Sequence, residues 1–268
     1  MHVLVGFIIA LFIAVTGVGA GTITVPILVL FLKVPAPIAV GIGLTFSAVV
    51  KLILLPAQVM RRNVSWRTLG FMLLGGAPGV LIGSLFLKQL AMAGSQNLMN
   101  ALLGAILVGT ASWQIAFSFR PMERRKETRD RGPLLSGLML AVGAEVGFSS
   151  AGAGALGSAA LLSLTSLEPA QVVGTDIAFG FFVSLIGSGA HWGSVSAGSA
   201  LLLELIAGGI AGAIAGTLLS TRIPRRALRF ALWVWLLILG GQFLLQSYQA
   251  WTRPANKTVV VHAASDGH

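Results

Sequence analysis

The stretch Gly17-Val18-Gly19-Ala20-Gly21-Thr22-Ile23-Thr24-Val25-Pro26 interrupts an apolar run that extends from Val3 to Leu32. Without this interruption, the run has the pattern of a single membrane helix. Three glycines in five residues are unfavourable inside a helix, so we expect the helix to break here. A break at membrane depth leaves backbone N–H and C=O groups unpaired, and these are tolerated only where they face protein or line a cavity. The stretch therefore predicts a helix break with a function.

A second copy of this break is Ser149-Ser150-Ala151-Gly152-Ala153-Gly154, inside the apolar run 134–164. Placing Gly19 on Gly152 also places Gly41 on Gly174, and we call this register the repeat alignment. With a two-residue gap, it also matches two sets of glycines, which are Gly75-Gly76, Gly79 and Gly83 in one and Gly208-Gly209, Gly212 and Gly216 in the other. A spacing of four between small residues favours close helix packing in membranes. The sequence thus predicts two related halves.

The composition is that of a polytopic membrane protein. Hydrophobic residues make up 56% of the chain and charged residues only 10%, far below the quarter or so typical of soluble domains. The net charge of +10 does not indicate a nucleic-acid partner, because the basic residues lie in short connections, where they mark membrane topology. There is no cysteine, and no enzyme motif or metal-ligand pattern is present. We therefore expect no enzyme, no cofactor and no metal.

The predicted fold is an all-α polytopic membrane protein with two inverted structural repeats, each made of a broken or re-entrant hairpin and three transmembrane helices. The expected segments are an N-terminal repeat 1–119 (hairpin 3–32, helices 38–60, 68–87 and 97–119), a basic cytoplasmic loop 120–133, a C-terminal repeat 134–251 (hairpin 134–164, helices 169–190, 197–220 and 226–250) and a polar tail 252–268.

The inversion follows from helix length and charge. Val3 to Thr16 comprises 14 residues, about 21 Å of helix, which is too short to span a membrane alone. If each broken run is a hairpin, each half crosses three times and only Lys33, Lys88, Arg253 and Lys257 lie on the less basic side. Four crossings per half would separate the basic residues less well, so the positive-inside rule favours the hairpins. We expect both termini outside and a multi-pass location in the inner cell membrane.

The pattern G-x-G-x-G-T-I-T-V-P, its second copy and the central basic loop resemble the sulfite exporter (TauE/SafE) family of membrane permeases. The resemblance covers Val3 to Ala250, although Ala20 and Ala153 stand where family members often have glycine. It implies transport, commonly outward, of sulfur-containing organic or inorganic anions such as sulfite, sulfoacetate or other sulfonates. It does not select one of these anions.

The two breaks are the predicted substrate site. Transporters with inverted repeats bind substrate near the midplane, where broken helices direct their N-termini at anionic groups. A single break would be explained by close packing alone, whereas two at equivalent positions favour a site. The candidate substrate-binding residues are Gly19, Ala20, Gly21, Thr22, Thr24, Lys51, Ser149, Ser150, Gly152 and Gly154.

Lys51 is the most informative single residue of the sequence. It precedes Arg61 by ten residues, about 15 Å of helix, which places it near mid-depth. A lysine there is costly and expected to be functional, with a partner. Asp176, eight residues past Glu168 on the equivalent helix of the other half, is the expected partner. The pair is either structural or couples the anion to a proton, and an unpaired Lys51 would attract the anion directly.

Three further residues are candidates for proton transfer. Glu145 lies in the arm that leads to the second break, and Glu204 lies in a small-residue helix where an interfacial position is the favoured alternative. His191 precedes Trp192 near the expected outer end of its helix. It would gate or shuttle protons near neutral pH, although an interfacial histidine bonded to backbone is the commoner case.

The sequence as a whole predicts a secondary transporter (permease) for small anions that works by alternating access, with proton coupling open. The alternatives are a passive anion channel or facilitator, a carboxylate transporter of the same fold, and a membrane enzyme or assembly factor without flux. The expected partners are the small anionic substrate and the lipid bilayer. The oligomeric state stays open, a dimer included.

Overall fold

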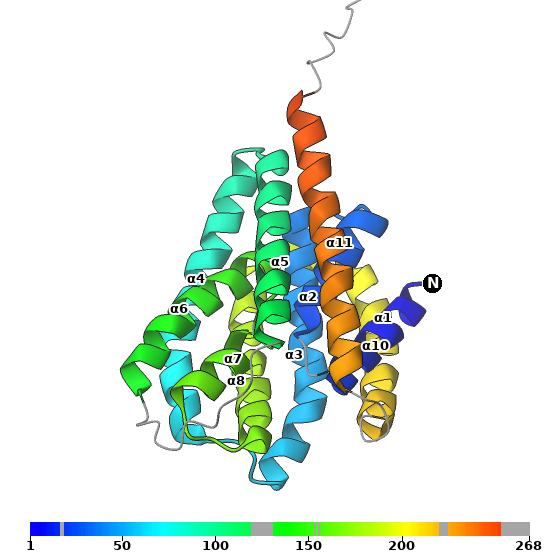
Figure 1. Cartoon of the computed structure of the whole chain (residues 1–268). Helices are drawn as coiled ribbons and strands as arrows, with labels where there is room; N and C mark the ends of the chain where they lie inside the picture. Colours follow the sequence, from blue (N-terminus) through cyan, green and yellow to red (C-terminus); the bar gives the residue numbers. More distant parts are fainter. Residues whose placement is uncertain (17–18, 119–130, 153, 155, 220–224, 253–268) are drawn as a thin grey trace, which may run out of the picture.

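The computed structural model describes residues 1–16, 19–118, 131–152, 154, 156–219 and 225–252, and this part of the chain is helical without strands. Figure 1 shows the arrangement of the elements. These are α1 (His2–Thr16), α2 (Ala20–Pro26), the π-helical turn η1 (Ile27–Phe31), α3 (Ala36–Met60), α4 (Trp66–Met92), α5 (Gln96–Ser118), α6 (Gly132–Ser149), α7 (Leu156–Leu164), α8 (Pro169–Ala190), α9 (Trp192–Ala197), α10 (Ser199–Leu219) and α11 (Arg225–Thr252). Gly17, Val18, Ala153 and most of the central basic loop lie outside the described residues.

Seven of the described helices are long and apolar enough to cross a membrane, namely α3, α4, α5, α6, α8, α10 and α11. Six membrane-spanning helices were expected, and the seventh candidate is α6, the predicted first arm of the second hairpin. With 18 residues, α6 reaches the length of a membrane span. Its counterpart α1 has 15 residues and α7 has 9, so both are shorter than a helix that spans a membrane.

Local sequence explains where one helix begins and how another changes its winding. Helix α8 begins with Pro169, whose missing N–H costs nothing at this position, and Glu168 and Gln171 form a capping box around its first turn. Helix α2 passes through Pro26 into the π-helical turn η1. Because an internal proline removes a helical hydrogen bond and clashes with the preceding turn, the wider winding accommodates it.

Two pairs of helices pack along the predicted glycine rows. In each pair, a Cβ on any of the three glycines would overlap the backbone of the partner helix. The contacts are Gly75 with Ser136, Gly79 with Leu140 and Gly83 with Ala144 between α4 and α6, and Gly208 with Val3, Gly212 with Phe7 and Gly216 with Leu11 between α10 and α1. The repeat alignment converts each contact of the first set into one of the second. The first helix of each half therefore packs against the other half.

Helices α3 and α8 form the antiparallel centre of the molecule. The Ser184 hydroxyl donates to the Ser47 hydroxyl at 3.1 Å, and the Thr45 and Ser188 hydroxyls lie 2.6 Å apart. Around this centre, Phe46 and Phe179 are fully buried against Gly209 and Gly76 respectively. These two aromatic contacts are again equivalent in the repeat alignment.

The two ends of the helix assembly differ in charge. The α3–α4 connection, with Arg61 and Arg62, lies at the lower end of Figure 1, as does the start of α6 beside Arg131. We call this the basic end. The α4–α5 connection and the end of α11 lie at the opposite end. Figure 1 also shows α6 rising from the basic end and α7 returning to it, whereas α1 descends toward the basic end and α2 with η1 rises away from it.

Candidate functional site

The two helix breaks lie against each other. A Cβ on Gly19 would come 3.4 Å from the backbone nitrogen of Gly154, and a Cβ on Gly21 would overlap the carbonyl and hydroxyl oxygens of Ser150. The glycines thus allow the first break to approach the second at backbone distance. We call this place the crossing, defined by Gly19, Gly21, Thr22, Ser150, Gly152 and Gly154. The side chain of Ala20 lies outside the described residues.

The second break contains two residues in the left-handed conformation. Ser150 ends α6 with φ 60°, and Gly152 follows with φ 86°. For a serine this conformation costs about 1–2 kcal/mol relative to a right-handed one. Such strain persists only where the surroundings enforce it, and it clusters at functional sites.

Two hydroxyl groups at the crossing are buried without a hydrogen-bond partner among the described residues. These are Thr22 Oγ1 and Ser150 Oγ. A Cβ on Gly43 would lie 3.1 Å from the Ser150 hydroxyl, so α3 also closes this space. An unpaired buried hydroxyl costs about 1–3 kcal/mol. Two of them where both breaks meet indicate a place for a polar ligand.

Other predicted site residues at the breaks already have partners. The Ser149 hydroxyl donates to the Glu145 carbonyl at 2.8 Å and accepts from the Ala151 N–H at 3.2 Å. Since a serine has a single O–H, Ser149 has no donor left for an anion. Thr24 is fully buried and takes part in an interaction of its own. Helix α2, with seven residues, is too short to contribute much of a helix dipole. The hydroxyls of Thr22 and Ser150 are therefore the better candidate ligands.

Glu145 lies directly beside the second break. Its Oε1 accepts a hydrogen bond from Thr110 Oγ1 at 2.7 Å, and a Cβ on Gly152 would lie 2.7 Å from Oε2. The carboxyl group is thus packed against the crossing itself. An ionised Glu145 would repel an anion bound at the crossing. Protonation of Glu145 and binding of an anion therefore favour each other.

Lys51 lies away from the crossing, which differs from the expectation that it balances substrate charge there. Its side chain occupies the space that Gly180 leaves open on α8, and Nζ is buried without a hydrogen-bond partner among the described residues. Gly43, which closes the crossing, precedes Lys51 by eight residues on the same helix, about 12 Å along the axis. Lys51 therefore lies on the basic-end side of the crossing.

Asp176 is the acidic group that acts electrostatically on Lys51. The two do not form an ion pair within 4.0 Å in the described part of the chain. Instead, Asp176 Oδ2 accepts a hydrogen bond from Ser158 at 2.9 Å, and its Oδ1 fills the space above Gly157. Asp176 thus joins α8 to α7, the arm that follows the second break.

His191 is buried rather than interfacial, with 5% of its surface exposed. Its Nε2 donates to the Gly147 carbonyl at 3.1 Å, near the end of α6. Burial lowers the pKa of the imidazole, the hydrogen bond to Gly147 opposes this, and the charge of Lys88 adds to it. Glu204, by contrast, is exposed and lies 2.7 Å from His2 Nδ1. The two groups join α10 to α1 at the surface.

Sequence reasoning did not find Gly43, Thr110 or Gly180. A signal was available for Gly43, because the repeat alignment places it on Asp176, a predicted site residue of the other half. Gly180 is aligned with Ser47, which the sequence did not single out, and Thr110 had no such signal either.

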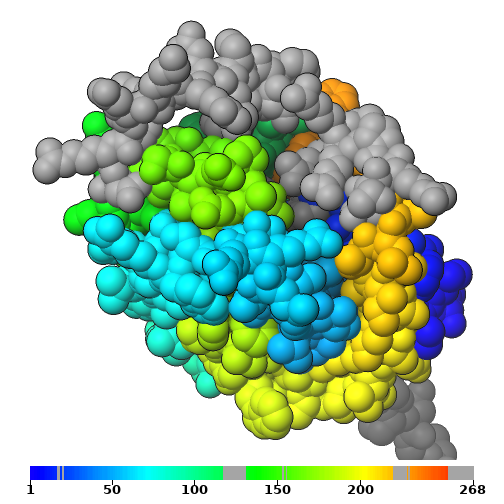
Figure 2. Space-filling view, turned by 90° about the horizontal axis from the view of Figure 1, so that it is seen from below, coloured from blue at the N-terminus to red at the C-terminus, as the bar shows by residue number. Residues whose placement is uncertain are grey.

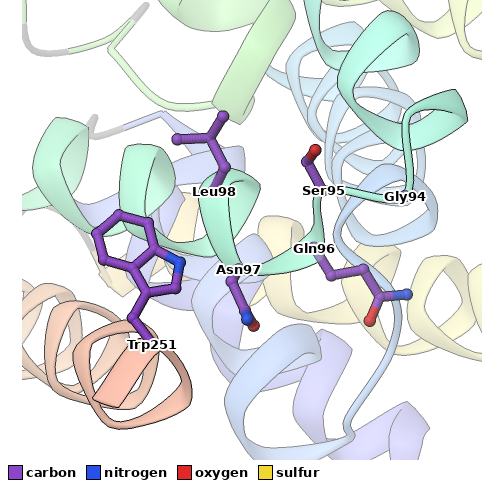
Figure 3. A pocket seen from close by; sticks show the side chains of 6 residues that line it. All are labelled: Gly94, Ser95, Gln96, Asn97, Leu98 and Trp251. Carbon is purple, nitrogen blue, oxygen red and sulfur yellow. The ribbon is translucent and has the colours of Figure 1, made fainter. Parts of the chain in front are cut away.

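Two hollows lie elsewhere on the structure. One, of about 430 Å³, lies between the α4–α5 connection and Trp251 of α11, far from the basic end. Figure 3 shows Trp251 facing the turn of Gly94 to Leu98. The other, of about 180 Å³, lies at the basic end and includes Arg67 and Arg131. Neither is lined by residues of the crossing.

A family sequence model described as Sulfite exporter TauE/SafE matches residues 2–243. The match includes both breaks, the central loop and all helices from α1 to α10. No curated protein and no solved structure matches the chain.

Proposed function

The chain belongs to the sulfite exporter TauE/SafE family, and we propose that it is a secondary transporter that moves small sulfur-containing anions such as sulfite, sulfoacetate or other sulfonates. The observation that carries this proposal is the pair of unpartnered hydroxyls, Thr22 and Ser150, where the two breaks meet within the described part of the chain. The oxygens of sulfite and sulfonate anions accept hydrogen bonds, and a hydrogen bond from a hydroxyl to such a charged oxygen is stronger than one between neutral groups.

Alternating access between two inverted halves is part of the proposal. The contacts of α4 with α6 and of α10 with α1 support it, because they are the same contacts repeated in the repeat alignment. Two equivalent arrangements of nearly equal energy are what a carrier needs to open to either side in turn. Export, rather than import, follows from the family alone.

The charged residues receive different roles. We assign Glu145, packed against the crossing, as the proton carrier of a coupled transport cycle. Lys51, with Asp176 nearby, lies between the crossing and the basic end. It attracts the anion on its way to or from the crossing rather than binding it there.

The test removes the two hydroxyls with little change in side-chain shape. Thr22→Val and Ser150→Ala are measured in proteoliposomes by uptake of sulfite and sulfoacetate, with Ser163→Ala as the matched control on the exposed face of α7. A hydrogen bond to a charged group contributes about 1.5–3 kcal/mol. We therefore expect apparent affinity to fall about 10-fold or more in each site variant and to stay unchanged in the control.

Thermal stability separates binding from packing in the same variants. Because neither hydroxyl has a hydrogen-bond partner among the described residues, their removal should leave Tm unchanged or raise it slightly. Variants with full affinity, or with affinity lost only together with Tm, would refute the binding role. Flux without saturation and without response to a pH gradient would instead indicate a passive anion facilitator.

A further inference from the structure

The hollow at the basic end has the composition of an anion site. It has a volume of about 180 Å³, room for about six water molecules at about 30 Å³ each. Arg67 and Arg131 contribute the charge, and Phe71 and Leu135 contribute apolar surface. Thr68 and Thr165 also line the hollow, but their hydroxyls already bond to Ser65 and to the Leu161 carbonyl, so the arginines are the donors for an anion. It lies at the start of α4 and α6, whereas the crossing lies at the end of α6.

The packing of α4 on α6 brings the two arginines together. The helices run parallel, so both begin at the basic end, and the contact of Gly75 with Ser136 holds them at backbone distance. The Ser136 hydroxyl also donates to the Phe71 carbonyl at 2.7 Å, which fixes the first turns of the two helices against each other. Arg67 and Arg131, far apart in the sequence, therefore line one hollow.

The electrostatics of the hollow favour an anion with several oxygens. Within the described ranges, no carboxylate lies within 4.0 Å of either guanidinium group. The hollow lies at the first turns of α4 and α6, where the helix dipoles add partial positive charge to the two full charges. Guanidinium groups bind phosphate oxygens in a bidentate manner, and two of them fit one phosphate group.

The depth of the hollow corresponds to the membrane surface. Trp66, the first residue of α4, is 59% exposed and directly precedes Arg67. Tryptophan prefers the level of the lipid headgroups, and basic residues at the same level attract anionic lipids. Figure 2 views the molecule from the basic end and shows the segment around residues 61–70 beside the segment around residues 160–170. Arg67 and Thr165, one from each segment, both line the hollow.

We propose that this hollow is a phosphate-binding site in which Arg67 and Arg131 hold the phosphate group of an anionic phospholipid or a free phosphate ion. Both sources share the chemistry that the arginines recognise. Occupancy would fasten the start of α4 to the start of α6 and so stabilise the folded protein. The proposal does not depend on the transported substrate.

The test measures Tm of the full chain in detergent after removal of copurified lipid. Phosphatidylglycerol, phosphatidylcholine and inorganic phosphate are added separately to wild type, Arg67→Gln, Arg131→Gln and the double variant. Arg61→Gln is the control, since Arg61 is exposed at the same end but does not line the hollow. We expect phosphatidylglycerol to raise the Tm of wild type and of the control by the same amount. The increase should be less than half as large in either single variant and absent in the double variant.

The outcomes separate the two sources of phosphate. An effect of phosphatidylglycerol beyond that of phosphatidylcholine, without one of inorganic phosphate, assigns the site to lipid. An effect of millimolar inorganic phosphate that requires both arginines assigns it to the free ion. Equal shifts in wild type and double variant, or an equal loss in Arg61→Gln, would overturn the proposal, because unspecific charge attraction would then explain the binding. Retention of most of the shift in Arg67→Lys would overturn the bidentate geometry, since charge alone would then suffice.

Discussion

At the scale of single residues, Lys51 and Asp176 are two buried charges that interact without touching. Each has its own space, Lys51 above Gly180 and Asp176 above Gly157. A charge buried without its counter-charge is strongly destabilising. Loss of either residue would therefore destabilise the protein whether or not the pair takes part in transport. For this reason, stability and transport have to be measured separately.

A double-mutant cycle makes this separation. Asp176→Asn leaves the Lys51 ammonium buried without its opposite charge, so we expect a clear fall in Tm. Adding Lys51→Met removes the stranded charge and should restore most of the lost Tm. If Lys51 guides the anion, the double variant will still transport more slowly than wild type, and a loss of attraction of about 1.4 kcal/mol would make transport tenfold slower. Recovery of both Tm and transport would show that the pair is structural only.

Glu145 allows a second prediction at this scale. Glu145→Gln keeps an oxygen to accept the Thr110 hydrogen bond but cannot release or take up a proton. We expect anion exchange between two loaded compartments to continue, while uptake driven by a pH gradient falls to the level without a gradient. The control is Glu204→Gln, because Glu204 is exposed and contacts only His2 among the described polar groups. Undiminished pH-driven uptake in Glu145→Gln would exclude Glu145 as the proton carrier.

At the scale of elements, the glycine rows hold the two halves together. Gly75 faces the Ser136 carbonyl so closely that a methyl group would force the helices apart, whereas Gly70 on the same helix has open space around it. Membrane helices gain from close approach because dispersion contacts and weak hydrogen bonds replace the hydrophobic effect. A Cβ would therefore disrupt packing at Gly75 but fit at Gly70.

Alanine substitutions test this difference directly. Gly75→Ala should lower stability by about 1–3 kcal/mol through overpacking. Gly70→Ala should be neutral or stabilising by up to about 1 kcal/mol, because alanine favours the helix. The measurement is Tm in detergent, and the second half offers a repeat with Gly208→Ala against Gly241→Ala, whose glycine also has open space. Equal effects of Gly75→Ala and Gly70→Ala would contradict the close packing of α4 on α6.

The glycine rows and the breaks were predictable because they are backbone features that repeat in one register. Gly75 and Gly208 carry the same pattern, so close packing along both rows follows from the sequence, whereas the partner helices α6 and α1 are known only from the structure. The position of Lys51 was not predictable in the same way. Counting residues from Arg61 gives a depth along one helix but not the neighbour, and Gly180 becomes that neighbour only through the packing of α3 on α8. The burial of His191 likewise depends on Gly147, which is distant in the sequence.

At the scale of the whole molecule, the candidate functional residues lie in order along the helix axes, from the crossing to the basic end. The crossing lies at the end of α6, Lys51 and Asp176 lie nearer the basic end, and the arginines lie at that end. On the proposed path, positive charge would attract anions toward the crossing, and the positive-inside rule would place the same basic residues on the cytoplasmic side. The proposed transport and the predicted topology thus both require the basic residues at this end.

The orientation that follows can be tested with single cysteines, since the chain has none of its own. Lys33→Cys and Lys88→Cys report on one end, and Arg61→Cys and Arg67→Cys report on the other, all at exposed positions. We expect a membrane-impermeant maleimide to label the first pair in intact cells and the second pair only after permeabilisation, because the positive-inside rule predicts that the basic end faces the cytoplasm. Labelling of both pairs in intact cells would mean that Lys33 and Arg61 share one side, which two hairpins and inverted halves forbid. The reverse pattern would keep the inversion but place the basic end outside, and the proposed direction of anion attraction would then be inward.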